Sequence, residues 1–157
     1  MSHSHEETEA IRTMVANVAH HIDGKRWAEL RALYADLSRI GEYVADDMVL
    51  HTAHRELCRD RSAGRVVGKA GAVTHERELI RMTGGTLVMD VQHIFANDHF
   101  GAAFGLLRAR LGGASLAMPF CGVWRFRGGL ITEHWENAYD VASVMAFLGD
   151  ESAAAPA

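Results

Sequence analysis

The second half of the chain carries four strand-length runs in succession, and this pattern limits the possible folds more than any other feature. Apolar and aromatic residues dominate the segments 86–96, 99–111, 114–127 and 130–139. The dipeptides between them are Asn97-Asp98, Gly112-Gly113 and Gly128-Gly129, which are typical of β-hairpin turns. The pattern therefore predicts an antiparallel meander in which each strand pairs with the next.

The first half predicts helices that can cover one face of this sheet. Apolar residues recur at helical spacing over 11–22 and again from about residue 26, and a third helix ends at Gly84. A strand is expected over 48–54, a short strand before the third helix, and a short last helix after Asp140. The expected class is α+β: a cone-shaped, strongly curved, mainly antiparallel sheet wrapped around three N-terminal helices, with a short C-terminal helix.

Length and charge narrow the range of functions. A chain of 157 residues with a net charge of −4 fits one domain over 1–157, with a core at about 8–149 and flexible ends at 1–7 and 150–157. No long Lys/Arg run suggests a nucleic-acid partner, and no apolar run is long enough to span a membrane. Cys58 and Cys121 follow no metal or disulfide spacing, which favours a cytoplasmic location.

The stretch GGLITEHWENAYD, residues 128–140, holds the densest group of candidate site residues. Side chains alternate along a strand, so the apolar pair Ile131 and Trp135 should face the helices and any cavity. The same face then carries Glu133 and Asn137, whereas His134 and Glu136 should face away. We expect Glu133 to act as a proton-transfer group, because burial in an apolar pocket raises a carboxyl pKa. If the strand contains a bulge, Glu136 takes that place.

Two more groups of residues are candidates for the same pocket. His51 and Thr52 end the first predicted strand, and His51 can exchange a proton near neutral pH. Met118, Phe120 and Trp124 recur with a period of two and are expected to line the pocket with Trp135 and Thr52. Gly122 interrupts that row and leaves room for a bend or a ligand.

The sequence predicts neither a metal nor another cofactor. Ten histidines are present, but none forms a recognised metal-binding motif. His75 is placed on a mainly polar helix face and is not expected to contribute to a site. Nucleotide-binding and serine-hydrolase motifs are also missing.

The passages RALYADL…VADDMVLHT and GVWRFRGGLITEHW, in this order and at this spacing, resemble the nuclear transport factor two-like superfamily, especially its SnoaL-like, polyketide cyclase-like branch. The resemblance covers residues 8 to 149. It implies a bent sheet enclosing a hydrophobic pocket and a homodimer packed through the outer sheet face. It leaves the function open, because the superfamily includes isomerases, cyclases, dehydratases and binding modules.

Two more distant branches fit less well. The base of the ketosteroid isomerases would fall at Thr52, and one of their oxyanion donors near Pro119. The limonene-epoxide hydrolases share Trp135, but Asn137 stands where they have an aspartate, and their arginine–aspartate pair would fall near Gly105 and Leu107. Both catalytic sets are therefore broken in this sequence.

The sequence favours a cofactor-free acid/base enzyme, a SnoaL-like cyclase, isomerase or dehydratase (a lyase), acting on a small hydrophobic carbonyl compound in an apolar pocket. His51 and Glu133 would move protons and Asn137 would donate a hydrogen bond. Two alternatives stay open: a non-catalytic small-molecule-binding or dimerisation module of the same fold, and an epoxide hydrolase with a modified triad.

Overall fold

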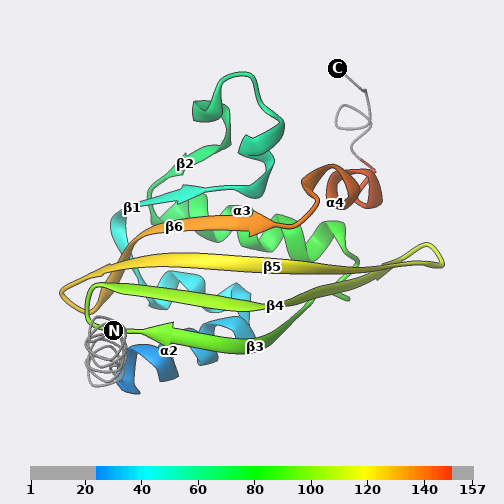
Figure 1. Ribbon diagram of the computed structural model, residues 1–157. Coiled ribbons are helices and arrows are strands. Elements are labelled where there is room, and N and C mark those ends of the chain that lie inside the picture. Colours follow the sequence, from blue (N-terminus) through cyan, green and yellow to red (C-terminus); the bar gives the residue numbers. More distant parts are fainter. Residues whose placement is uncertain (1–23, 150–157) are drawn as a thin grey trace, which may run out of the picture.

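A computed structural model describes residues 24–149 and shows a curved, unclosed sheet of six strands with helices against one face (Figure 1). The strands are β1 (Val44–His51), β2 (Arg65–Val67), β3 (Val88–Ala96), β4 (Phe100–Leu111), β5 (Ala114–Arg127) and β6 (Leu130–Ala138). The helical elements are α2 (Gly24–Ala35), η1 (Leu37–Glu42), η2 (Ala53–Leu57), η3 (Arg61–Gly64), α3 (Lys69–Met82) and α4 (Val141–Phe147). The predicted α+β class with a short C-terminal helix is confirmed.

The sheet has the order β2-β1-β6-β5-β4-β3, and every neighbouring pair is antiparallel except β1 with β6. The meander from β3 to β6 is the one predicted from the turn dipeptides. Gly112 and Gly113 have φ of 56° and 84°, and two successive positive φ values match the hairpin turn whose twist suits the flanking strands. The predicted helix over 11–22 and both predicted flexible ends lie outside the described residues.

The first strand differs from the prediction at both ends. It begins at Val44 and stops at His51, where the prediction placed it over 48–54. The strand starts earlier because Val44 pairs with Ile131 of β6, whereas β2 pairs only with Val49, Leu50 and His51. His54 falls in η2, beyond the strand.

The core lies between the helices and the inner face of the sheet. Its fully buried side chains include Leu33, Ile40, Met48, Trp124 and Ile131. Helices α2 and α3 cover this face, and α4 lies beside the end of β6 (Figure 1). Within the described residues no helix is long and apolar enough to cross a membrane.

A bulge in β6 decides which side chains face the helices. Arg125 pairs with Glu133 and the next residue, Phe126, pairs with Ile131, so Thr132 is an extra residue in β6. Alternation restarts after it, and both Ile131 and His134 are buried.

Candidate functional site

A cavity of about 360 Å³ lies between the inner face of the sheet, α3, η2 and α4. Its apolar wall includes Leu37, Leu79, Leu107, Phe120, Val144 and Leu148. Its polar groups include Tyr34, Thr52, His75, Glu76, His134 and Glu136. An apolar pocket with a few converging polar groups is the usual form of a small-molecule site.

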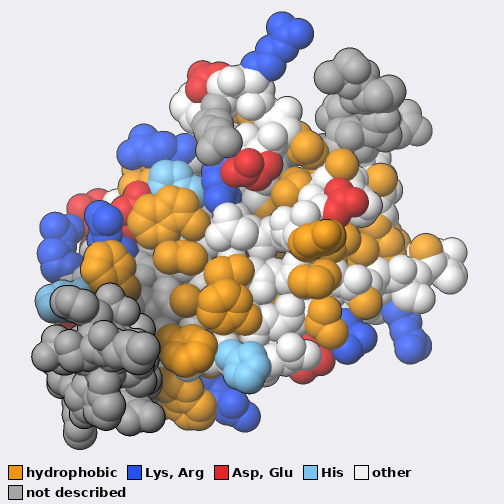
Figure 2. All heavy atoms as spheres, viewed as in Figure 1, with side chains coloured by type: hydrophobic (Ala, Val, Ile, Leu, Met, Phe, Trp, Pro, Cys, Tyr) orange, Lys and Arg blue, Asp and Glu red, His pale blue; other side chains and the backbone are white. Residues whose placement is uncertain are grey.

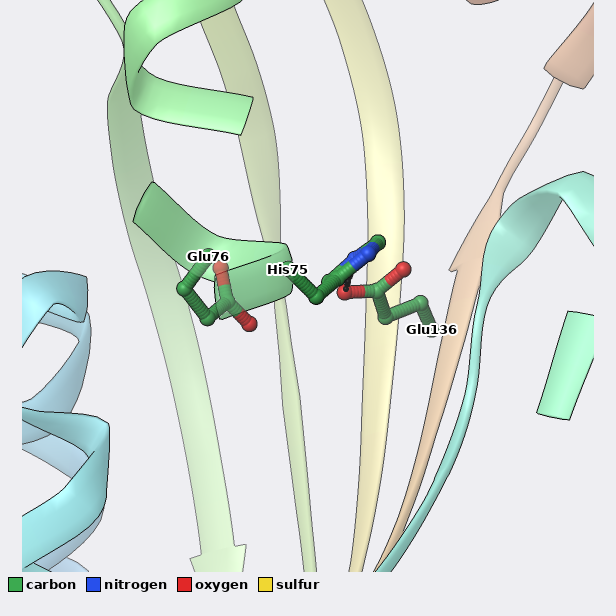
Figure 3. Close-up of side chains that lie close together, drawn as sticks. All are labelled: His75, Glu76 and Glu136. Carbon is green, nitrogen blue, oxygen red and sulfur yellow. Dashed lines mark hydrogen bonds and ion pairs between the residues drawn. The ribbon is translucent and has the colours of Figure 1, made fainter. Parts of the chain in front are cut away.

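The end of β6 and the middle of α3 bring an imidazole and a carboxylate into contact. His75 from α3 and Glu136 from β6 point toward one another (Figure 3), and His75 Nε2 donates to Glu136 Oε1 at 2.9 Å. The backbone N–H of Ala53 donates to Glu136 Oε2 at 3.2 Å. Burial alone would lower the pKa of His75, but the hydrogen bond and charge of Glu136 raise it to about 9. Burial opposes the charge on Glu136, yet His75, His134 and the Ala53 N–H hold the pKa of that carboxyl below its usual value. At neutral pH the two groups are therefore a charged pair.

Glu76, the next residue of α3, is neutral at neutral pH, in contrast to the charged pair of His75 and Glu136. Its side chain is buried, with 3% of the residue exposed, and within residues 24–149 no hydrogen bond or ion pair to its carboxyl is found. Burial first, and then the charge of Glu136, raises the pKa of Glu76 to about 8. At neutral pH the cavity thus contains one ionised carboxylate and one neutral carboxylic acid, which is the division of roles that acid/base chemistry needs.

His134 and Tyr34 form the other polar part of the wall. The His134 ring stacks on Trp124 with centroids 3.4 Å apart, and its Nδ1 donates to the Val123 carbonyl at 2.9 Å. Burial lowers the pKa of His134 to about 4, so the ring is neutral. Tyr34 Oη accepts a hydrogen bond from Trp124 Nε1 at 3.1 Å, and burial raises the pKa of this phenol.

The prediction that Glu133 and Trp135 face the cavity is wrong, because the extra residue Thr132 reverses the alternation after Ile131. His134 and Glu136, predicted to face away, line the cavity instead, as the bulge alternative proposed for Glu136. The bulge thus exchanges Glu133 and Trp135 with His134 and Glu136, whereas Asn137 lines the cavity as predicted.

Glu133 belongs to a cluster on the outer face of the sheet. Glu133 Oε1 accepts from His51 Nε2 at 2.8 Å and Glu133 Oε2 lies 3.3 Å from Arg125 Nη1. His51 stacks on Trp135 with centroids 5.1 Å apart. The structure therefore brings His51 and Glu133 together, but away from the cavity.

The remaining predicted residues divide between the cavity and the core. Thr52, Phe120 and Asn137 line the cavity, whereas Met118 and Trp124 are buried but do not line it. The Asn137 side chain donates to the Cys121 carbonyl at 2.9 Å and accepts from Arg55 at 2.6 Å, so both ends of its amide are bound within the protein.

Arg55 joins the two strand ends beside the cavity. It donates to the carbonyl oxygens of His51, Thr52 and Glu136 at 3.1, 2.9 and 2.5 Å, as well as to Asn137. This fixes the backbone of Glu136 against η2, whose Ala53 N–H holds the Glu136 carboxylate.

His75 and Glu76 were missed by the sequence prediction, although Glu76 had a readable signal. Buried residues in and just after α3 follow the helical spacing of Ala72, Glu76 and Thr83, so a glutamate occupies the apolar stripe. His75, Glu76 and Glu136 also offer ligand atoms that lie within 4.8 Å of one another, the one such cluster found in the described part of the chain. A metal there would need Glu76 to ionise. The cofactor-free site stays a prediction.

This curved sheet with a cavity under its helices defines the nuclear transport factor two-like fold class, and solved structures of that class match the chain. Bal32a, from a soil-derived mobile gene cassette, has 23% identity and a TM-score of 0.67 over 79% of this chain and 96% of its own. A protein from Jannaschia sp. CCS1, assigned as a SnoaL-like polyketide cyclase, has 14% identity and a TM-score of 0.65 over 86% and 96%. TerC, co-crystallised with polyporic acid, has 16% identity and a TM-score of 0.60 over 76% and 95%.

The SnoaL-like domain model matches residues 15–134, and the chain belongs to this family. No curated protein matches the chain. The family includes cyclases and isomerases, and the resemblance inferred from the sequence is confirmed.

Proposed function

We propose that the cavity binds a small hydrophobic carbonyl compound and moves protons on it without a cofactor, as a cyclase, isomerase or dehydratase does. The observation that carries this proposal is Glu76, a carboxyl group buried in the cavity wall without a hydrogen-bond partner in the described residues. Among the described residues no fully buried side-chain oxygen or nitrogen lacks a partner, so the Glu76 carboxyl opens onto the cavity, where a ligand oxygen can accept its proton.

In the proposed step, the carbonyl oxygen of the ligand accepts the proton of Glu76 while Glu136 takes a proton from the neighbouring carbon. The C–H electron pair becomes the enol double bond, and the carbonyl π pair forms the new O–H bond. Return of the proton to a carbon, together with loss of the enol proton to Glu76, restores both carboxyl groups. His75 holds Glu136 in place and stabilises its charge between turnovers. This assignment replaces His51 and Glu133, whose predicted catalytic roles depended on a place in the cavity.

Two of the structural neighbours support a small-molecule ligand. TerC was crystallised with polyporic acid, and a protein from Catenulispora acidiphila with a ketosteroid isomerase-like fold was crystallised with trimethylamine. The apolar wall of this cavity favours an uncharged ring system over an ionic ligand.

Deuterium exchange tests the proposed step. Bicyclic ketones such as 1-indanone are incubated with the protein in D2O, and α-carbon exchange is followed by NMR. Glu136→Gln should lower the rate roughly 10²- to 10⁴-fold. Glu133→Gln is the matched control, because Glu133 lies on the same strand and also pairs with a histidine, but on the outer face. Loss of exchange in Glu133→Gln with retention in Glu136→Gln would instead support the sequence-based assignment.

A binding module without catalysis is the alternative to an enzyme. Calorimetry on the same ketones, combined with the deuterium-exchange assay, distinguishes a binding module from an enzyme. A binding module would bind the ketones, but their α-carbon exchange would be no faster than in buffer alone. Epoxide hydrolysis is a third candidate, since two carboxyl groups line the cavity and one could activate a water. Diol formation from an aromatic epoxide, lost in Glu136→Gln, would identify that reaction.

The proposal includes a homodimer through the outer face of the sheet and a cytoplasmic location. Phe95, Phe100 and Phe104 are 55%, 54% and 42% exposed, and hydrophobic side chains gather over the strands (Figure 2). Such a patch is typical of an interaction surface. Light scattering should give twice the mass of the chain, and Phe95→Glu with Phe104→Glu should halve it. A wild-type monomer at micromolar concentration would exclude this dimer. The two free cysteines suit a reducing compartment.

A further inference from the structure

Tyr34 leaves one hydrogen-bonding capacity unused at the cavity wall. Its oxygen accepts from Trp124 Nε1 at 3.1 Å, and within the described residues no acceptor for its own proton is found. A phenol carries one donor and accepts on the same oxygen. The Tyr34 O–H is therefore available to a ligand in the cavity that Tyr34 lines.

His134 leaves the complementary capacity unused. A carbonyl oxygen only accepts, so the contact between Nδ1 and the Val123 carbonyl fixes the proton on Nδ1. Nε2 then carries a lone pair, and the part of the chain that the structure describes provides no donor to it. His134 is 4% exposed and lines the cavity, so its remaining free atom can only meet a ligand or a trapped water.

The donor and the acceptor flank one point of the wall, next to Gly122. A Cβ placed on Gly122 would lie 2.0 Å from Tyr34 Oη and 3.3 Å from His134 Cε1. Trp124 fixes both rings, stacking on His134 with 8° between planes and meeting Tyr34 edge-on with centroids 5.7 Å apart. The space left at Gly122 is thus filled by the Tyr34 hydroxyl, and the two polar atoms are held rigidly.

We propose that Tyr34 and His134 form a subsite for a hydroxyl group, so that the ligand carries a phenolic or enolic O–H besides the carbonyl that faces Glu76. This inference rests on the proposed function, since it assumes that the cavity takes a small hydrophobic molecule. A hydroxyl accepts from Tyr34 and donates to His134 through one oxygen atom. An ether or carbonyl oxygen accepts from Tyr34 but leaves His134 Nε2 without a donor.

A matched series of probes tests the subsite on the full chain. Calorimetry compares 2-naphthol, 2-methoxynaphthalene and naphthalene, which differ in that single group. We expect 2-naphthol to bind roughly 10- to 100-fold more tightly than its methyl ether. ¹⁵N NMR should show a shift of the His134 Nε2 resonance with 2-naphthol and not with the ether.

Tyr34→Phe should remove most of the preference for 2-naphthol, with the melting temperature checked because Trp124 loses its acceptor. Tyr43→Phe, a tyrosine outside the cavity lining, is the matched control and should keep the preference. Equal affinities of 2-naphthol and its ether for the wild type would overturn the subsite and leave the proposed binding function intact. Failure of these three probes and of 1-indanone to bind would overturn the proposed function itself. Because the wild-type comparison needs no variant, poor folding of Tyr34→Phe does not affect this test.

Discussion

Replacing Glu76 by glutamine should make the protein's stability much less dependent on pH. In the unfolded chain this carboxyl ionises near its ordinary pKa of 4.5, whereas burial raises its pKa in the folded protein to about 8. Between these values the folded state keeps a proton that the unfolded state has lost. The free energy of unfolding must therefore fall as pH rises through this window.

The size of the effect follows from the two pKa values. Each pKa unit corresponds to about 1.4 kcal/mol, so the wild type should lose about 3 kcal/mol between pH 5 and pH 8 through this group alone. Urea denaturation of the wild type and Glu76→Gln at both pH values measures the loss. The comparison uses the change in the free energy of unfolding with pH in each protein. A cost of burying the glutamine amide that does not depend on pH therefore drops out.

Glu78→Gln is the control, because Glu78 lies on the same helix but is exposed and paired with Arg81. It should leave the slope between pH 5 and pH 8 unchanged. His75 adds a decline of the same sign, since its pKa of about 9 lies above its ordinary value of 6.5, but this contribution is present in every variant. An unchanged slope in Glu76→Gln would mean that Glu76 is ionised at neutral pH, and the proposed neutral acid would be refuted.

Two further substitutions test the wall of the cavity. Arg55→Met should lower the free energy of unfolding by about 2–4 kcal/mol, because three carbonyl oxygens and Asn137 each lose a hydrogen bond from its guanidinium. Urea denaturation that shows no larger loss than in Arg39→Met, an exposed arginine, would contradict this. Gly122→Ala should cost about 1–3 kcal/mol, since the new methyl group would overlap the Tyr34 hydroxyl. In a Tyr34→Phe background this cost should shrink, and a double-mutant cycle with no coupling would exclude the overlap.

The hairpins were predictable from the sequence because glycine pairs mark their turns locally. The side-chain facing of β6 was not, because it depends on one extra residue. Thr132 has no feature in the sequence that distinguishes it from a regular strand residue, and its effect appears only when β6 pairs with β5. Glu133, His134 and Glu136 change face after it, which is why His134 and Glu136 line the cavity in place of Glu133, whereas Asn137 lines it as predicted.

The site residues on α3 show a different limit. The helix was predicted correctly, and Glu76 on its apolar stripe could have been noticed as a buried acid. His75 could not have been noticed in this way. Neighbouring residues on a helix point about 100° apart, so the His75 side chain lies on the face that the sequence predicts to be polar. That face meets the end of β6, and only the tertiary fold places it there.

The two histidine–glutamate pairs on β6 show that composition alone does not identify the site. Their hydrogen bonds are nearly equal, 2.8 Å for His51–Glu133 and 2.9 Å for His75–Glu136, and their side chains are similarly exposed. The outer pair is completed by Arg125, which lies beside the second Glu133 oxygen.

Beside the inner pair lies Glu76, a third carboxyl group that lacks a partner in the described residues and makes the fold less stable at neutral pH. A structural ion pair has no need of such a group, whereas a ligand carbonyl that accepts its proton would stabilise the neutral acid. A bound ketone should therefore raise the pKa of Glu76 further, and its protection of the protein should weaken as pH rises above about 8, where Glu76 ionises in the free protein.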